Sequence, residues 1–219
     1  MVNADPDLVV AKVSDTHLLV FNKFCVFRPQ YLILTLNSFK RQTERLDRTD
    51  LSAAWSILQG LKSRYFVIFN CGHEAGCSRL HKHMQVIPYP DTTTLFPDRQ
   101  SLDPGDIPFK YYVKRFDDRQ DSPAAKLSGA LIENYENLCE VAYEAWQAST
   151  TGFLTYFPHN VVLTKGWIMV IPRRRAEMQG ASANAAGMMG MVWVTASQQL
   201  DCWKIHGPLK ILSELGVAS

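Results

Sequence analysis

Three polar side chains that could do chemistry recur at every second position of one stretch: His81, His83 and Gln85. A period of two is typical of a β-strand, so we expect all three on one face of a sheet, with Met84 and Val86 on the other. A neutral imidazole can attack phosphorus to form a phosphoramidate, which splits one difficult displacement into two easier ones. One ring nitrogen must then donate to a fixed acceptor, so that the other presents its lone pair. The stretch therefore predicts a strand, over residues 80–88, that carries a histidine nucleophile.

A loop containing glycine precedes this strand. It runs from Asn70 to Arg79, follows an apolar run at residues 65–69, and contains two glycines and Ser78. Backbone N–H groups in such a loop, together with a serine hydroxyl and an arginine, can hold phosphate oxygens. An anion-binding loop is therefore expected beside the histidine strand.

Two other interpretations of the histidines stay open from the residues alone. They could be structural, since two histidines on a strand can arise from composition. They could also belong to a zinc site, because imidazole and thiolate are zinc ligands. The potential ligands are Cys71, His73, Cys77, His81 and His83. Their spacing matches no common zinc pattern, so no metal site is expected.

The combination of Asn70-x-Gly72, Gly76-x-Ser78 and His81-x-His83-x-Gln85 resembles the histidine-triad superfamily. It resembles the branch in which glutamine replaces the third histidine, the nucleotidyltransferases. These comprise the ATP adenylyltransferases (diadenosine tetraphosphate phosphorylases) and the galactose-1-phosphate uridylyltransferases. The resemblance to the fungal-type ATP adenylyltransferases covers about residues 10–216. It implies an α+β fold with a histidine-triad-like antiparallel sheet, helices packed mainly on one side, and a single domain over residues 1–219.

The same resemblance implies a role for each site residue. His83 would attack an α-phosphorus and become nucleotidylated, while His81 and Asn70 fix the geometry of ring and loop. Gln85 would hydrogen-bond a non-bridging oxygen of the transferred group. An amide cannot act as a general acid or base near neutral pH, so an anionic acceptor such as phosphate suits the site better than water. The other implied substrate contacts are Asn22, Lys23, Gly76, Cys77, Ser78, Arg79, Asn184, Ala185, Ala186, Met191 and Thr195.

Several features depart from the family pattern. Gln30 stands where relatives usually carry a histidine, Thr195 where they carry a lysine, and Arg79 where many carry a neutral amide. The family's chains are longer at the N-terminus, where a substrate-contacting lysine lies, and this sequence is expected to begin after it. Two functions therefore compete. One is phosphorolysis of diadenosine tetraphosphate to ATP and ADP, and the other is nucleotide binding with little turnover by a truncated or degenerate paralogue.

Composition limits the partners. The 219 residues carry a net charge of +2, which gives no argument for nucleic-acid binding, and no apolar run approaches the length of a membrane helix. Five scattered cysteines suggest reduced thiols and a cytoplasmic location, with the nucleus as an alternative. The expected partners are diadenosine tetraphosphate, ATP, ADP and phosphate, bound by a monomer or homodimer. A divalent cation such as Mg²⁺ is a candidate aid to polyphosphate binding.

Hydrophobic periodicity and turn residues predict the surrounding elements. The other expected strands span residues 17–21, 31–36, 65–69, 109–116, 160–164, 167–171 and 191–194. The expected helices span residues 47–63, capped by Thr49 or Asp50, 127–149 and 207–215. The expected irregular parts are a tail at 1–8, an excursion at 89–106, a polar loop at 117–126 and a small-residue flexible segment at 180–190. The triplet Arg173–Arg175 is either a solvated turn or a phosphate-facing group.

Overall fold

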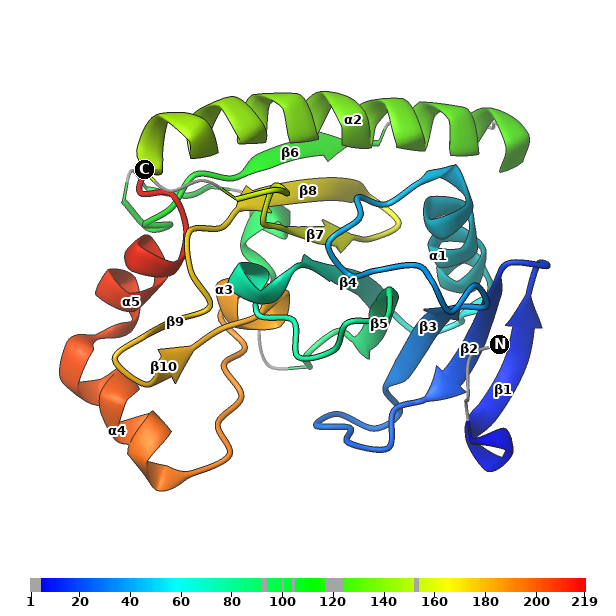
Figure 1. The fold of residues 1–219 in the computed structure, drawn as a ribbon, viewed down its shortest axis with the longest axis horizontal. Coiled ribbons are helices and arrows are strands. Elements are labelled where there is room, and N and C mark those ends of the chain that lie inside the picture. The colour runs from blue at the N-terminus through cyan, green and yellow to red at the C-terminus, as the bar shows by residue number, and fades with distance from the viewer. Residues whose placement is uncertain (1–4, 92–93, 100, 104, 117–123, 152–153) are drawn as a thin grey trace.

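The computed structural model describes residues 5–91, 94–99, 101–103, 105–116, 124–151 and 154–219. Within these residues an eight-stranded antiparallel sheet has the order β1-β2-β3-β5-β4-β7-β8-β6 (Figure 1). The strands are β1 (Val9–Val13), β2 (His17–Phe21), β3 (Tyr31–Thr35), β4 (Tyr65–Cys71), β5 (His83–Pro88), β6 (Tyr112–Arg115), β7 (His159–Leu163) and β8 (Trp167–Pro172). A two-stranded ribbon, β9 (Glu177–Met178) with β10 (Ala181–Ser182), lies apart from it. The architecture confirms the α+β class.

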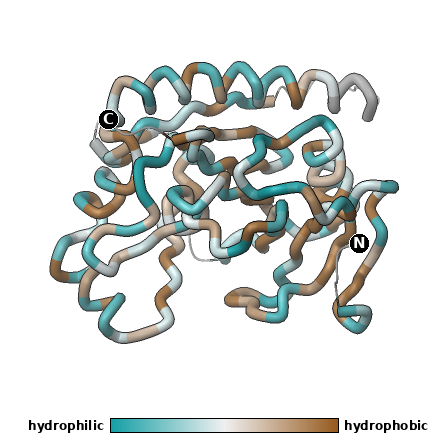
Figure 2. Tube along the Cα trace, viewed as in Figure 1, coloured by the Kyte–Doolittle hydropathy of each residue, from teal (hydrophilic) through white to brown (hydrophobic). Residues whose placement is uncertain are grey.

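Helices contribute to cores on both faces of the sheet. The helices are α1 (Arg48–Gly60), α2 (Ala124–Ser149), α3 (Ala185–Met188), α4 (Ser197–His206) and α5 (Pro208–Leu215). The two longest, α1 and α2, pack on the face that carries Val67 and Phe69 of β4. The three short helices share the second core with Phe66 and Ile68, on the opposite face. Figure 2 shows polar and apolar residues alternating along α2, as expected for a helix with one buried side. None of the described helices is both long and apolar enough to span a membrane.

Helix α1 begins one residue after its cap. The Asp47 carboxylate accepts the N–H groups of Thr49 (2.8 Å) and Asp50 (3.1 Å). The Asp50 carboxylate in turn accepts the N–H of Asp47 at 2.8 Å, which completes a capping box. Asp47 is therefore the cap, and the expectation of Thr49 or Asp50 was wrong. Both lie inside the first turn.

Asp50 also joins a buried ionic cluster that ties the histidine strand to the fold. Its carboxylate lies 2.6 Å from Lys82 Nζ and 3.0 Å from His17 Nε2. All three side chains are at most 2% exposed, and Lys82 also donates to the carbonyl of Arg45 at 2.6 Å. The cluster connects β2, α1 and the residue immediately before β5. It therefore holds the start of β5 from the face opposite His83.

Several sequence expectations about the C-terminal half were wrong. The segment expected to be flexible, 180–190, forms β10 and α3, and Ala181, Ala185 and Ala186 are fully buried. Small side chains permit this burial by letting backbones approach closely, whereas composition alone suggested mobility. The strand expected at 191–194 is absent, and helix α4 follows instead. The helix at 207–215 and the strands at 160–164 and 167–171 are confirmed, and these two strands pair as an antiparallel hairpin.

The N-terminal and central differences are smaller. Strand β1 was not anticipated, and residues 5–8 of the expected tail form a short 3₁₀ turn at Pro6–Leu8, while residues 1–4 lie outside the described part. The strand expected at 109–116 is shortened to β6. Helix α2 begins at Ala124, inside the polar loop expected at 117–126, of which residues 117–123 are not described. The excursion at 89–106 is irregular where described, apart from a 3₁₀ turn at Phe96–Asp98.

Candidate active site

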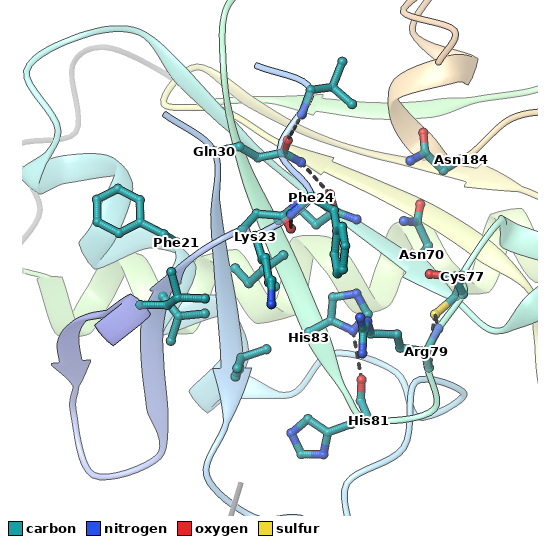
Figure 3. A pocket seen from close by; sticks show the side chains of 18 of the residues that line it. Phe21, Lys23, Phe24, Gln30, Asn70, Cys77, Arg79, His81, His83 and Asn184 are labelled. Carbon is teal, nitrogen blue, oxygen red and sulfur yellow. Dashed lines mark hydrogen bonds between the residues drawn. The ribbon is translucent and has the colours of Figure 1, made fainter. Parts of the chain in front are cut away.

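A cleft of about 820 Å³ lies on the sheet face opposite α1 and α2 (Figure 3). Strands β2, β3 and β5 contribute to its floor, and the segment 76–79, the loop 22–30 and the start of α3 contribute to its walls. The predicted site residues that line it are Asn22, Lys23, Asn70, Gly76, Cys77, Ser78, Arg79, His81, His83, Gln85 and Asn184. The period-two prediction is confirmed, because Met84 and Val86 are buried in the core behind these side chains.

His83 has its ring fixed by the main chain. Its Nδ1 lies 2.8 Å from the carbonyl oxygen of His81, and its own backbone N–H donates to Gln42 Oε1 at 2.8 Å. A carbonyl oxygen can only accept, so Nδ1 carries the proton and Nε2 keeps its lone pair. The side chain is 8% exposed, and this burial lowers the pKa of the imidazole below its usual 6.5. The imidazole is therefore neutral and held in one defined tautomer, in which Nε2 has a lone pair that could attack phosphorus.

The ring of His81 serves a different purpose. Strand β5 begins at His83, so His81 lies just before it in an isolated bridge with Arg41. Its Nε2 lies 2.9 Å from the carbonyl oxygen of Thr35 and 3.1 Å from the Thr35 hydroxyl. Figure 3 shows this ring pointing away from His83. The expected strand start at residue 80 was wrong, and His81 orients the ring of His83 through its carbonyl group.

The side chain of Asn70 lines the cleft and is held in place by a chain of buried hydrogen bonds. Its Oδ1 accepts from Asn160 Nδ2 (2.8 Å) and from the backbone N–H of Ala185 (2.9 Å). The Oδ1 of Asn160 is held at 2.6 Å by Arg173, which is fully buried. With its oxygen doubly engaged, Asn70 has its NH₂ group left for the cleft. Asn160 was not among the predicted site residues, since an Asn in an apolar strand gives no sign of its partner.

Other side-chain amides in the cleft wall also have their oxygen bound by the protein, as Asn70 does. Gln85 Oε1 accepts from Gln30 Nε2 at 2.9 Å, and Asn184 Oδ1 accepts from the N–H of Gly187 at 3.1 Å as the cap of α3. Asn22 Oδ1 accepts a backbone N–H two residues further on, at 3.0 Å. Each oxygen is engaged, and each NH₂ group has no protein partner within the described ranges. The wall therefore presents donors, which suit a ligand rich in acceptor oxygens.

The loop between β4 and β5 depends on two glycines with positive φ. Gly72 has φ +83° and Gly76 has φ +84°, values that favour glycine. A Cβ on Gly76 would lie 2.7 Å from the carbonyl oxygen of Ala183, so the loop also needs a close backbone approach here. Ser78 and Arg79 follow as exposed residues at the rim of the cleft. The placement fits the anion-binding loop predicted from the sequence.

The arginine triplet is neither of the two arrangements expected. Arg173 donates to Asn160 and to four carbonyl groups, those of Ala75, Arg175, Ala183 and Leu215. Burial lowers the pKa of Arg173 to about 9, so the group remains charged near neutral pH. Arg175 pairs on the surface with Glu214 at 3.6 Å. Arg173 therefore fixes the segments around the cleft and does not line it.

Four predicted contact residues lie away from the cleft lining. Ala185 and Ala186 are buried within α3, where Ala185 contributes only its backbone N–H to Asn70. Met191 and Thr195 lie beyond α3, and Thr195 hydrogen-bonds to Gln199. The lining residues that sequence analysis missed include Asp5, Leu8, Phe24, Gln30 and Trp193. An aromatic residue in a loop is a general sign of a binding surface, and Phe24 and Trp193 could have been noted on that basis.

Metal ligands do not converge in the part of the chain that the structure describes. No three His, Cys, Asp or Glu side chains there form a group suited to a metal ion. Of the potential zinc ligands, Cys71 is buried in the core with α1 and α2, on the opposite face of the sheet from the cleft. Among the lining residues that the structure describes, Asp5 contributes the only carboxylate.

A fixed neutral histidine facing a donor-lined cleft on an antiparallel sheet fits the nucleotidyltransferases of the histidine-triad type. Family models make this specific. Residues 1–101 match the Ap4A phosphorylase N-terminal domain, and residues 105–218 match the ATP adenylyltransferase C-terminal domain. The chain belongs to the Ap4A phosphorylase (ATP adenylyltransferase) family.

Individual relatives agree with this assignment. The chain is 26% identical over 228 residues to diadenosine 5',5'''-P1,P4-tetraphosphate phosphorylase 2 of Saccharomyces cerevisiae, covering 91% of this chain and 69% of that protein. Protein APA1 of the same yeast is 26% identical over 201 residues, with 82% and 61% covered. The crystal structure of yeast Ap4A phosphorylase Apa2 with AMP superimposes with a TM-score of 0.83 at 28% identity, covering 99% of this chain and 80% of that one. The Apa2 complex with Ap4A gives 0.80 at 27% identity, with 99% and 79% covered.

Proposed function

We infer that this chain is an Ap4A phosphorylase, which cleaves diadenosine tetraphosphate with inorganic phosphate into ATP and ADP. The observation that carries this function is the Nδ1–H···O=C bond of 2.8 Å between His83 and His81, which leaves one nucleophilic nitrogen at the cleft. The family match supports the substrate, and the crystal structure of the Apa2 relative contains Ap4A. The competing function, nucleotide binding with little turnover, is not favoured because the tautomer-fixing contact is present.

The reaction proceeds in two displacements. In the first, Nε2 of His83 attacks the α-phosphorus, a P–N bond forms, and the bond to the bridging oxygen breaks to release ATP. In the second, an oxygen of inorganic phosphate attacks the same phosphorus, the P–N bond breaks, and ADP leaves. The histidine returns to its neutral form, so no net proton is taken up by the enzyme.

Hydrogen-bond donors in the cleft stabilise the negative charge on the transferred group. We assign the NH₂ groups of Gln85 and Asn70 to the non-bridging oxygens, where negative charge must be stabilised in the transition state. Lys23 and Arg79 line the cleft as cations and suit the rest of the polyphosphate. Donors already fixed by the fold need little reorganisation during the reaction, which is the usual source of their effect on rate.

A divalent cation would enter the cleft as a complex with the polyphosphate. The lining residues within the described ranges offer one carboxylate, Asp5, and so provide few oxygen ligands for Mg²⁺. We propose that the phosphate oxygens supply most ligands to the ion. Titrating Mg²⁺ at several concentrations of diadenosine tetraphosphate tests this, since the optimal Mg²⁺ concentration would then rise with that of the substrate.

One assay tests the proposed function. Purified protein is incubated with diadenosine tetraphosphate and ³²P-labelled phosphate, and the nucleotides are separated. The expected products are ATP and ADP in equal amounts, with all new label in ADP. When phosphate is omitted and the substrate carries the label, an acid-labile adenylyl group should accumulate on the protein. AMP and ATP as the only products, or no turnover, would refute phosphorolysis.

A further inference from the structure

Gln30 occupies the cleft at the end of the loop that leads into β3. Its side chain, 2% exposed, makes two hydrogen bonds. Its Oε1 accepts the backbone N–H of Val26 at 3.0 Å, and its Nε2 donates to Gln85 Oε1 at 2.9 Å (Figure 3). We propose that Gln30 is a positioning residue which decides which end of the Gln85 amide faces the substrate, and thereby which acceptor the enzyme uses.

The direction of this chain of bonds is set by the backbone. The N–H of Val26 can only donate, so Gln30 must present its oxygen to it and its NH₂ group to Gln85. Gln85 must then present its own oxygen to Gln30, which leaves its NH₂ group for the cleft. The last torsion of a glutamine is roughly two-fold, so without Gln30 either end of the amide could face the substrate.

The two orientations of Gln85 favour different acceptors, and this argument rests on the proposed function. An NH₂ group facing the cleft stabilises the anionic phosphoryl group of adenylyl-His83. An oxygen there would repel the phosphoryl oxygens and would accept a hydrogen bond from an attacking water. Inorganic phosphate brings its own negative charge and needs no such acceptor, whereas water must lose a proton during attack. Gln30 therefore favours phosphorolysis over hydrolysis.

A double-mutant cycle tests whether Gln30 acts through Gln85. The variants are Gln30→Met, Gln85→Met and the double variant, because methionine keeps the volume and adds no charge. The readout is the ratio of ADP to AMP formed from the shared adenylyl-enzyme. Gln30→Met should lower this ratio about three- to tenfold, as expected for one misoriented hydrogen bond. In the Gln85→Met background the same change should have no further effect.

Two results of this double-mutant cycle would overturn the proposal. One is an unchanged ADP to AMP ratio in Gln30→Met. The other is an equal effect of Gln30→Met with and without Gln85, which would mean that Gln30 merely anchors the loop through Val26. Thermal unfolding of all variants confirms that each is folded at the assay temperature.

A second readout separates this proposal from the proposed function. The side-chain NH₂ signal of Gln85, identified in ¹⁵N spectra by its loss in Gln85→Met, should shift when AMP binds to the unmodified chain. The Gln85 signal should shift less in Gln30→Met. An equal shift in both proteins would mean that Gln30 does not orient the Gln85 amide. If the unmodified chain forms no ADP from phosphate, phosphorolysis fails, while this shift still decides the orientation of Gln85.

Discussion

The imidazole Nδ1 of His83 lies 2.8 Å from the main-chain oxygen of His81, while the His81 ring bonds to Thr35. The ring of His83 is thus oriented by a backbone group two residues earlier in the chain. No substitution of the His81 side chain deletes that group. The two histidines of the motif therefore differ sharply in what their side chains contribute.

Replacing each histidine should expose this difference. His83→Ala removes the nucleophile, and we expect phosphorolysis to fall at least about a thousandfold, equivalent to roughly 4 kcal/mol of barrier. His81→Ala keeps the carbonyl acceptor, so its turnover should fall less than about tenfold. Both are measured as ATP and ADP release, with trapping of the adenylyl group as a second readout. Near-normal turnover in a folded His83→Ala protein would disprove the nucleophile assignment.

The acid limit of the reaction should lie below the ordinary imidazole range. Burial lowers the pKa of His83 from 6.5, and only the neutral ring can attack, so the rate of adenylyl transfer should fall to half its plateau at a pH below 6.5. The folded chain binds this proton less tightly than the unfolded chain, so the free energy of unfolding also decreases as the pH falls below 6.5. Single-turnover labelling across pH, with circular dichroism on the same samples, separates the two effects. An acid limb centred above pH 6.5 would contradict the assignment.

Exchanging Gln85 for histidine should change the acceptor. The new imidazole would titrate near neutral pH beside adenylyl-His83 and could take a proton from water. Gln85→His should lose phosphorolysis and gain hydrolysis to AMP, moving the product ratio by at least about tenfold. The ratio is measured by nucleotide separation with phosphate present. A folded variant with an unchanged ratio would show that another group, such as Ser78 with Arg79, selects the acceptor.

The buried ionic cluster behind β5 should matter for stability. Lys82→Met leaves Asp50 without its closest cation in a dry environment, and loss of one partner of such a pair costs about 3 kcal/mol or more. Lys12→Met is the matched control, since Lys12 is 58% exposed and pairs with Asp15 at 2.7 Å. That change should alter stability by less than about 0.5 kcal/mol. Urea unfolding of both variants measures the difference, and equal stabilities would mean that the cluster is not a stabilising unit.

Patterns that depend on near neighbours predicted much of the fold. The period-two alternation placed His83 and Gln85 on one face and Met84 on the other, and the helical spacing of α2 held to its last residue, Ser149. These succeed because burial of one face imposes a period on the sequence. The cap of α1 was misplaced because Asp47, Thr49 and Asp50 are all suitable capping residue types, and only the geometry distinguishes them.

Features that depend on distant partners were beyond sequence analysis. Lys82 is buried because Asp50 faces it, and Arg173 because five acceptors surround it. The partners of Lys82 and Arg173 cannot be recognised from the residues next to them in the sequence. The alanines of α3 suggested mobility because small side chains bury little surface by themselves. They pack well only against a second surface, and the sequence does not reveal that surface. Gln30 was noticed as a departure from the family pattern, but its bond to Gln85 joins residues 55 positions apart.

The boundary between the two family-model segments has a practical consequence. It falls at residues 101–105, yet β4 from the first segment pairs with β7 from the second, and α1 packs on α2. His83 and Asn184, on opposite sides of the boundary, share the cleft. We therefore expect fragments 1–101 and 105–219 to be inactive alone and to regain phosphorolysis when co-expressed. If each is fused to one of two interacting proteins, ATP release becomes a split-enzyme sensor of their proximity, whereas a cooperative melt of the first fragment alone would show independent folding.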